Sequence, residues 1–431
     1  MEEQEKEFYS KLQVTRSIKF FVGKKSDKFI GLNKLKLTNN EKFSCDLTTI
    51  LTRKKEVVAV NLTTHLDSCI INISKNSNWL QEDYQYINKI KECLIKISKY
   101  KPMTWEEAFT KHDTRVLIAS VFTYCSERFE SRLKKLKEDI KNGKNNQYIK
   151  SFLEYASISV NINDGKANPL IKSKVCCYYY KNISKNVNIP KDFLKHLRKV
   201  GSYMRSLISI ISCACNEKYK VLFFNMDLNI LKPIITHQPI FSWRNIIQKL
   251  IPNFIKYVDF KNAYLSNKIK ADRLAIIYDG ILECDFIKKD ICLHAEMNIL
   301  NEIINQKKKT RTYIAVSKKC CYLCELYIKF AQEQGYNIII SGAHRKIYNL
   351  WKLPSPTDIA FKSNFLSYAL EELNRIIQEE VNSILEGLLP ELPESDSNKS
   401  SINSDQIMLY DKEHNAKLDN VLESVFNFDM S

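Results

Sequence analysis

Residues 294–296 read His-Ala-Glu, and residues 321–324 read Cys-Tyr-Leu-Cys. Together they supply one imidazole, one carboxylate and two thiols, and Cys321 follows Glu296 by 25 residues. Each half alone is weak evidence, because a chain with 7 His and 13 Cys contains such short patterns by chance. The order of the two halves and the elements expected around them carry the argument.

Both halves of this motif are predicted to lie at helix starts. Apolar residues recur at helical spacing over residues 293–304, which places His294 and Glu296 in the first turn of an amphipathic helix. Cys321 and Cys324 open a second helix, where positions i and i+3 share one face. The positive end of that helix favours thiolates, the form that binds metal ions. The two helix starts are therefore expected to face each other across one metal ion.

The flanking sequence predicts the strands of an α/β fold. Residues 312–316 and 337–340 are typical of buried strands. Two apolar runs, residues 274–278 and 281–286, surround an Asp-Gly pair at 279–280, which favours a β-hairpin with a type I′ turn. The order hairpin, helix, strand, helix, strand implies at least one parallel strand pair with a right-handed connection. It also places both helices on one side of the sheet.

The residue types of the motif suit a catalytic metal centre. Two thiolates and one imidazole leave the fourth position of a tetrahedral zinc ion open, and water bound there has a pKa near 7. Glu296 is not needed as a ligand, so its predicted role is proton transfer. Two alternatives remain open. One is a closed structural zinc site with His344 as the fourth ligand, and the other is a pair of buried thiols without metal.

Three further stretches extend the pattern: Ser317–Cys324 (SKKCCYLC), Ser341–His344 (SGAH) and Trp351–Pro354 (WKLP). With them the chain resembles the cytidine-deaminase superfamily, in a divergent branch of fungal proteins and bacterial polymorphic-toxin nucleic-acid deaminases. The resemblance covers about residues 250–360, roughly a quarter of the chain. It implies a mixed sheet flanked by helices, with zinc as the cofactor where the two helix starts meet.

By this resemblance His294, Cys321 and Cys324 are the zinc ligands and Glu296 is the catalytic proton shuttle. The sequence departs from the family pattern at Cys320, which stands where the template has proline before the first cysteine. Cys320 and Cys324, at i and i+4, also share a helix face, so this second register stays open. The pair Cys321 and Cys324 keeps the spacing of the template and is favoured.

The resemblance implies hydrolytic deamination of a nucleobase, with cytosine favoured over adenine. Residues 391–431 contain nine acidic residues and three lysines, so the rest of the chain is more basic than the total charge of +17. Such a body attracts polyanions, which favours a nucleic acid or nucleotide substrate and makes single strands the expected form. Two alternatives are a free nucleoside deaminase and a catalytically inactive, zinc-stabilised interaction module.

Three residues that follow the motif in the sequence are candidate substrate contacts. Tyr348 and Trp351 offer aromatic faces on which a base can stack. His344 is a candidate contact for a base or a phosphate, with an orienting role at a strand end as the alternative. Trp351 also has a second interpretation, as a lid over the core.

The chain is expected to divide into four parts. Residues 1–245 predict a mainly helical domain of unknown role, and residues 250–360 a zinc deaminase-like domain. Residues 361–389 predict an amphipathic helix that packs on this domain. Residues 390–431 predict a disordered acidic tail, which either docks on a protein partner or folds over the basic body.

The composition indicates the cellular compartment in which this chain is expected. The 13 scattered cysteines favour a reducing compartment, so an intracellular protein, cytoplasmic or nuclear, is expected. The start of the sequence is polar and acidic, unlike a signal peptide. The longest apolar run, residues 207–215, is too short to span a bilayer, which predicts no membrane partner. Nothing in the sequence indicates an oligomeric state.

Overall fold

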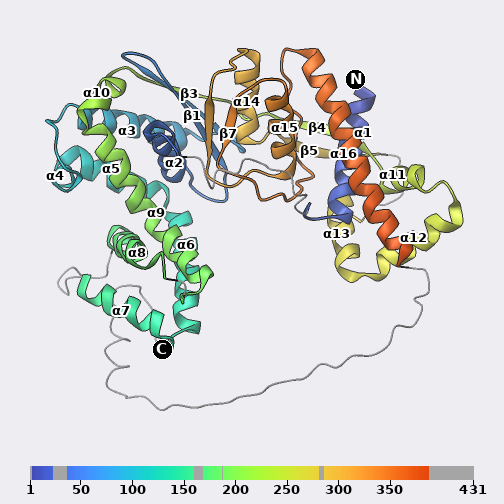
Figure 1. Ribbon diagram of the computed structural model, residues 1–431, viewed down its shortest axis with the longest axis horizontal. Coiled ribbons are helices and arrows are strands. Elements are labelled where there is room, and N and C mark those ends of the chain that lie inside the picture. Colours follow the sequence, from blue (N-terminus) through green and yellow to red (C-terminus); the bar gives the residue numbers. More distant parts are fainter. Residues whose placement is uncertain (1, 23–35, 160–167, 187, 281–285, 388–431) are drawn as a thin grey trace.

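A five-stranded mixed sheet forms the centre of the computed structural model, which describes residues 2–22, 36–159, 168–186, 188–280 and 286–387 (Figure 1). The strand order is β3-β2-β1-β6-β7. The strands are β1 (Val58–Thr64), β2 (Cys69–Lys75), β3 (Met226–Ile230), β6 (Thr312–Val316) and β7 (Ile338–Ile340). β1 is antiparallel to β2 and β6, whereas β3 is parallel to β2 and β7 is parallel to β6. The predicted α/β fold with a mixed sheet and flanking helices is confirmed.

The sheet takes its strands from both sides of residue 245. β1, β2 and β3 precede that residue, and Ala59 and Val60 of β1 pair with Val316 and Ala315 of β6. β6 is buried over most of its length, so it needs a strand on each edge to satisfy its backbone groups. The fold therefore does not divide at residue 245 as expected, although most elements before that residue are helices.

Helices cover both faces of this sheet. Successive side chains of a strand point to opposite faces, so each strand contributes residues to two cores. Ala59 and Ile314 enter one buried core, and Val60 and Ala315 enter the other. The core of Val60 is built with α2 (Asn39–Ile50), α3 (Gln81–Ser98), α4 (Trp105–Phe109), α5 (His112–Tyr124), α6 (Ser126–Asn142), α7 (Gln147–Ser159), α8 (Pro169–Ile183), α9 (Lys191–Ala214) and α10 (Glu217–Phe224).

The core that contains Ala59 lies on the face of the sheet against which the two motif helices pack. Its helices are α1 (Glu2–Ile18), α11 (Trp243–Leu250), α12 (Phe254–Ser266), α13 (Lys268–Tyr278), α14 (Ala295–Asn305), α15 (Tyr322–Glu333) and α16 (Ile359–Glu386). Figure 1 shows α14 and α15 beside the sheet, with α1 and α16 packed along each other farther out. The predicted placement of both motif helices on one side of the sheet is confirmed, as is the parallel strand pair.

The predicted C-terminal helix over residues 361–389 is α16. Phe365 of this helix packs edge to face on Tyr327 of α15, with ring centroids 4.6 Å apart. The tail expected at residues 390–431 lies outside the described residues. Within the described part of the chain, no helix combines the length and the apolar character needed to cross a membrane.

The hairpin predicted around the Asp-Gly pair is wrong. Residues 274–278 are the end of α13, and Asp279 (φ 53°) and Gly280 (φ 76°) cap that helix in the left-handed region. A type I′ turn and a helix C-terminus both require positive φ, so the same dipeptide suits either. The strand that follows, β5 (Phe286–Cys292), pairs instead with β4 (Ile235–Phe241) in a separate antiparallel ribbon. Residues 281–285 lie outside the described residues.

Candidate metal centre and its pocket

His294, Cys321 and Cys324 meet where the two motif helices begin. His294 is the N-cap of α14 and Cys321 is the N-cap of α15. The Nδ1 atom of His294 lies 3.6 Å from Sγ of Cys321 and 3.3 Å from Sγ of Cys324. The two sulfur atoms are 3.4 Å apart. The structure therefore brings the three predicted ligands together, although 27 residues separate His294 from Cys321 in the chain.

This donor set fits a zinc ion. Zinc bonds of about 2.3 Å to sulfur and about 2.0 Å to nitrogen place tetrahedral donor atoms roughly 3.5–3.8 Å from one another. The three observed separations, 3.3 to 3.6 Å, are close to these values. Within the described residues, the cluster has no fourth His, Cys, Asp or Glu donor. The geometry therefore favours an open fourth position over a closed structural site.

The local backbone selects the register of the cysteines. As N-cap, Cys321 accepts a hydrogen bond at Sγ from the backbone N–H of Cys324, at 3.5 Å. Cys320 precedes the helix, and its N–H donates to the carbonyl of Gly342, which ties it to the strand end after β7. Burial raises the pKa of the Cys320 thiol. Cys320 is therefore a buried neutral residue outside the donor cluster, and Cys321 and Cys324 form the pair.

Electrostatics already favour a thiolate at this centre. Burial alone would raise the pKa of Cys321, but the hydrogen bond between its side chain and that of Cys324, together with the charge of His294, outweighs it and lowers that pKa to about 5. For His294, burial acts to lower the pKa, and the Cys321 thiolate overcomes it and raises the pKa to about 9. The pKa of Cys324 is raised by its burial and by Cys321. Cys321 is thus preset in the form that ligates metal ions.

Trp351 had two interpretations, as a stacking face for a base and as a lid over the core, and the structure contradicts the first. Its side chain is fully buried, and its indole Nε1 donates a hydrogen bond to Sγ of Cys324 at 3.2 Å. The ring also packs edge to face on Phe8 of α1, with centroids 6.0 Å apart. A base cannot stack on a buried ring, so the stacking interpretation is wrong. Trp351 instead orients a candidate ligand, the kind of support that metal sites use.

Glu296 supplies an uncommitted carboxylate beside the cluster. It lies in the first turn of α14 and is 2% exposed, and its Oε2 atom is buried without a hydrogen-bond partner in the structure. A buried carboxylate oxygen without a partner is costly, and such groups concentrate at functional sites. Its position beside His294 and Cys321 suits a group that exchanges protons with a bound molecule.

A pocket of about 240 Å³ opens over this cluster. Its lining comprises Lys55, Val57, Asn76, His294, Ala295, Glu296, Lys318, Lys319, Cys321, His344 and Tyr348. The ring of Tyr348 lies 5.8 Å from that of His294 and 5.7 Å from that of His344, measured between centroids. Two of the three predicted substrate contacts, His344 and Tyr348, therefore line the pocket.

The loop that carries His344 is attached to the start of α15. The backbone N–H of His344 donates to the carbonyl of Cys320, and its Nδ1 accepts from the N–H of Lys346 at 3.1 Å. This second bond turns the ring into the loop, where Arg345 adopts a positive φ of 55°. Burial lowers the pKa of His344, which favours the neutral ring. His344 is thus a pocket wall residue outside the donor cluster.

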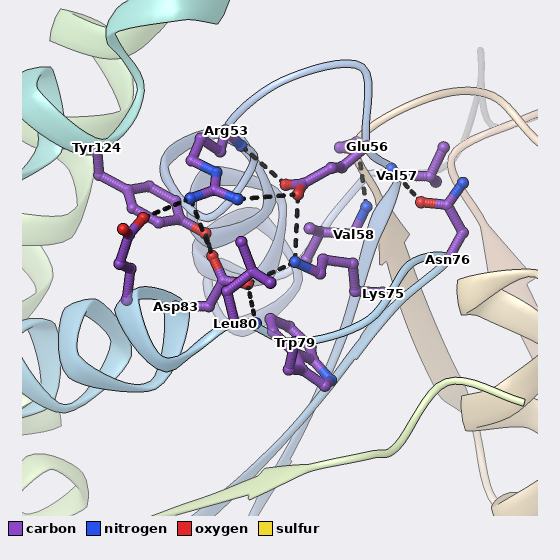
Figure 2. Close-up of polar contacts among 12 residues, drawn as sticks. Arg53, Glu56, Val57, Val58, Lys75, Asn76, Trp79, Leu80, Asp83 and Tyr124 are labelled. Atoms are coloured by element: carbon purple, nitrogen blue, oxygen red, sulfur yellow. Dashed lines mark hydrogen bonds and ion pairs between the residues drawn. The ribbon is translucent and has the colours of Figure 1, made fainter.

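The opposite wall comes from residues that carry no sequence motif. Val57 follows α2, and its N–H donates to Oδ1 of Asn76 at 2.7 Å (Figure 2). The carbonyl of Lys55 accepts a hydrogen bond from Nζ of Lys318 at 2.8 Å. Lys55, Val57 and Asn76 lie more than 200 residues before the motif, and only the pairing of β1 with β6 brings them to the pocket.

A buried ionic network holds this wall in place. Nζ of Lys75, at the end of β2, lies 2.6 Å from Asp83 and 3.2 Å from Glu56, and all its side chain is buried (Figure 2). Burial acts to raise the pKa of Asp83, but hydrogen bonds led by that of Lys75 lower it, so the carboxylate stays charged. Arg53 contacts both carboxylates from the loop before β1. The network fixes the segment that leads to Lys55 and Val57.

Comparison with known proteins bears on this region. Residues 293–355 match the model of a family described as "OTT_1508_deam:-like deaminase". The matched stretch begins one residue before His294 and includes Glu296, both cysteines of the cluster and the pocket loop. The search of curated proteins gave no match, and neither did the search of solved structures. The stretch is cytidine-deaminase-like, as the motif indicated, and the match supports deamination as the reaction.

Proposed function

We propose that this cytidine-deaminase-like chain is a zinc-dependent hydrolase that deaminates a nucleobase in single-stranded nucleic acid, with cytosine favoured over adenine. One observation carries the proposal. The carboxylate of Glu296 is buried, one of its oxygens has no hydrogen-bond partner among the described residues, and it lines a pocket beside three donor atoms that fit a zinc ion. A purely structural metal site has no use for a carboxylate placed in this way.

His294, Cys321 and Cys324 would hold the ion, which supplies a Lewis acid that makes water a nucleophile at neutral pH. Glu296 takes a proton from the attacking water and delivers it to the ring nitrogen beside the reacting carbon. It then passes the second water proton to the exocyclic amine, which leaves as ammonia while the carbonyl forms. Water and an amino base thus give a keto base and ammonia, with Glu296 returned to its starting state.

The pocket supports a base as the substrate. Its volume of about 240 Å³ is below the range of roughly 300–1,000 Å³ found for drug-sized ligands, which suits a single flat ring system. Tyr348 is 46% exposed and offers a face for stacking. Lys55, Lys318 and Lys319 add positive charge to the lining, which favours a substrate that carries phosphate.

The test is to incubate the purified, zinc-loaded protein with single-stranded DNA, single-stranded RNA, cytidine and adenosine, and to measure base conversion. Glu296→Gln removes the proton shuttle and keeps the shape, so zinc content should be unchanged while turnover falls by at least about a hundredfold. Glu302→Gln, a change of the same type on the same helix, is the control and should remain active. Equal turnover in Glu296→Gln and wild type would refute the proposed role.

A further inference from the structure

A second and larger cavity, of about 910 Å³, lies next to the catalytic pocket. Asn349 and Leu350 form part of its lining and directly follow Tyr348, which lines the catalytic pocket. Consecutive Cα atoms are about 3.8 Å apart, so Tyr348 and Leu350 are separated by at most about 7.6 Å between Cα atoms. The same three-residue segment therefore borders both cavities.

Cations gather around one aromatic ring at this second cavity. Phe20 is 38% exposed, and the Cζ atom of Arg16 lies 4.1 Å from the centre of its ring. Nζ of Lys346 lies 5.0 Å from the same centre, and Cζ of Arg273 lies 5.8 Å from it. Positive groups interleaved with an exposed aromatic face are the elements that bind single-stranded nucleic acids, since phosphates meet the cations and bases stack on the ring.

Within the described part of the chain, no ion pair neutralises the positive charge at Arg16. Its Nη1 atom is buried without a hydrogen-bond partner, and among the described residues neither Arg16 nor Arg273 forms an ion pair. Burial lowers the pKa of the Arg16 guanidinium, and the like charge of Arg273 lowers it further. An uncompensated, partly buried pair of this kind is costly, and an anion between the two groups would stabilise it.

Carboxylates of the lining do not supply that anion. Asp279 is paired with Lys289 at 2.5 Å, and Asp290 is paired with His237. Asp272 is exposed, and the described residues give it no ion pair. Arg273 donates one hydrogen bond, from Nη1 to the carbonyl of Ser17 at 3.4 Å. Among the described residues the lining thus gives its two guanidinium groups no carboxylate partner, while most of its acidic groups are paired elsewhere.

Hydrogen bonds tie α1 and Phe20 to the segment that borders both cavities. The N–H of Ile347 donates to the carbonyl of Phe20 at 3.2 Å, one residue before Tyr348. The side chain of Gln13, one turn before Arg16 on α1, donates to the carbonyl of Asn349 and accepts from its side-chain amide. Arg16, Phe20 and Tyr348 are therefore held in a fixed relation.

We propose that the second cavity binds the nucleotide next to the target base in a single-stranded polynucleotide, with its phosphodiester between Arg16 and Arg273 and its base against Phe20. The inference rests on the proposed function for the identity of the target. It makes the substrate a polynucleotide, because a nucleoside fills the catalytic pocket alone and leaves the second cavity empty.

The test compares two double variants of the full-length, zinc-loaded protein. Arg16→Gln with Arg273→Gln removes the two cavity cations. Lys19→Gln with Lys270→Gln removes two charges from the same part of the fold, where both lysines face Glu380 outside the cavity, at 3.6 and 3.7 Å. The probe is a fluorescent single strand of nine nucleotides with one central cytosine, and its binding is measured by anisotropy across a range of salt concentrations.

Loss of both arginines should weaken binding of the probe by at least about tenfold at low salt. It should also reduce the slope of log K against log salt by about 0.7, since the two arginines share one phosphodiester and each neutralised phosphate of a single strand contributes roughly 0.7. The lysine variant should keep the wild-type slope to within a few tenths. Phe20→Leu, at an exposed position, should weaken binding by about tenfold through lost stacking and leave the slope unchanged.

Kinetics separate this inference from the proposed function. The arginine variant should raise KM for the nine-nucleotide strand and leave the turnover of cytidine and cytidine monophosphate as in wild type. Equal losses on the strand and the monophosphate would overturn the polynucleotide subsite, as would wild-type binding of the probe by both the arginine variant and Phe20→Leu. If wild type converts no base, the reaction is refuted, while the binding measurements still decide whether Arg16 and Arg273 hold the strand.

Discussion

The indole N–H of Trp351 donates a hydrogen bond to the sulfur of Cys324 across 3.2 Å, inside the same core that buries the candidate metal ligands. Hydrogen bonds to a ligand sulfur stabilise its thiolate and fix its direction, and support of this kind typically changes metal affinity by 10–100-fold. Trp351 therefore links the core packing of α1 and α16 to the candidate ligand Cys324.

Trp351→Phe should lower zinc affinity by roughly tenfold or more, because it removes the donor and keeps an aromatic ring. Competition with a coloured chelator measures the change. Trp243→Phe is the matched control, since Trp243 is fully buried in the same core and its Nε1 has no hydrogen-bond partner among the residues that the structure describes. Both variants should lose similar stability, but only Trp351→Phe should lose zinc affinity; equal zinc affinity in the two would contradict the role.

Alkylation should reveal the charge state of Cys321 in chelator-treated protein. Because its pKa is about 5, the thiol is ionised above that pH, and iodoacetamide should modify it at pH 6 well before the other cysteines. His294→Gln removes a charge that lowers this pKa, so the midpoint of the rate profile should move to higher pH. Mass spectrometry of the labelled peptides measures both effects. A midpoint near 9 in wild type would show that the buried centre does not stabilise the thiolate.

Lys75→Met should destabilise the fold by about 3–5 kcal/mol, since it removes the closest cation from the buried Asp83 and the half-buried Glu56 and leaves them only Arg53, at 3.9 Å. Urea unfolding measures the loss. The same change should raise KM, because the network positions the segment before β1 that lines the pocket. Lys54→Met, which breaks an exposed pair with Glu127, should cost under about 1 kcal/mol and leave KM unchanged. Similar costs for the two variants would refute the structural importance of the buried network.

Tyr348→Ala should weaken binding of single-stranded substrate by about 1–3 kcal/mol, because a stacking face is lost from the pocket. Tyr348→Phe keeps the ring and should stay close to wild type, so the pair of variants separates stacking from the hydroxyl group. Steady-state kinetics give KM and kcat for each. An equal effect of both variants would assign the contribution to the hydroxyl instead.

The local parts of the site were predictable from the sequence. Helical periodicity placed His294 and Glu296 at one helix start and Cys321 at another, and the structure confirms both starts and strands β6 and β7. These predictions succeed because spacing along one element determines which side chains share a face. The alternatives at Cys320 and His344 needed the three-dimensional donor geometry, which excludes both from the cluster.

The parts that depend on distant pairing were not predictable in this way. Lys55 and Asn76 reach the pocket only because β1 lies between β2 and β6, and no periodicity specifies that strand order. The hairpin prediction at Asp279 and Gly280 was wrong because their positive φ suits a helix end as well as a hairpin turn. The sequence left Trp351 either as a stacking face or as a lid over the core, and its packing on Phe8 of α1, at the other end of the chain, decides between them.

Zinc-edge X-ray absorption of the zinc-loaded protein counts the donors around the ion and so decides whether His294, Cys321 and Cys324 hold zinc with one open position. We expect one zinc per chain with two sulfur ligands at about 2.3 Å and two nitrogen or oxygen ligands at about 2.0–2.1 Å. Glu296→Gln should leave this spectrum unchanged, and Cys321→Ser should reduce the sulfur count to one. A wild-type spectrum with three sulfur ligands, or a protein that binds no zinc, would contradict this set of ligands.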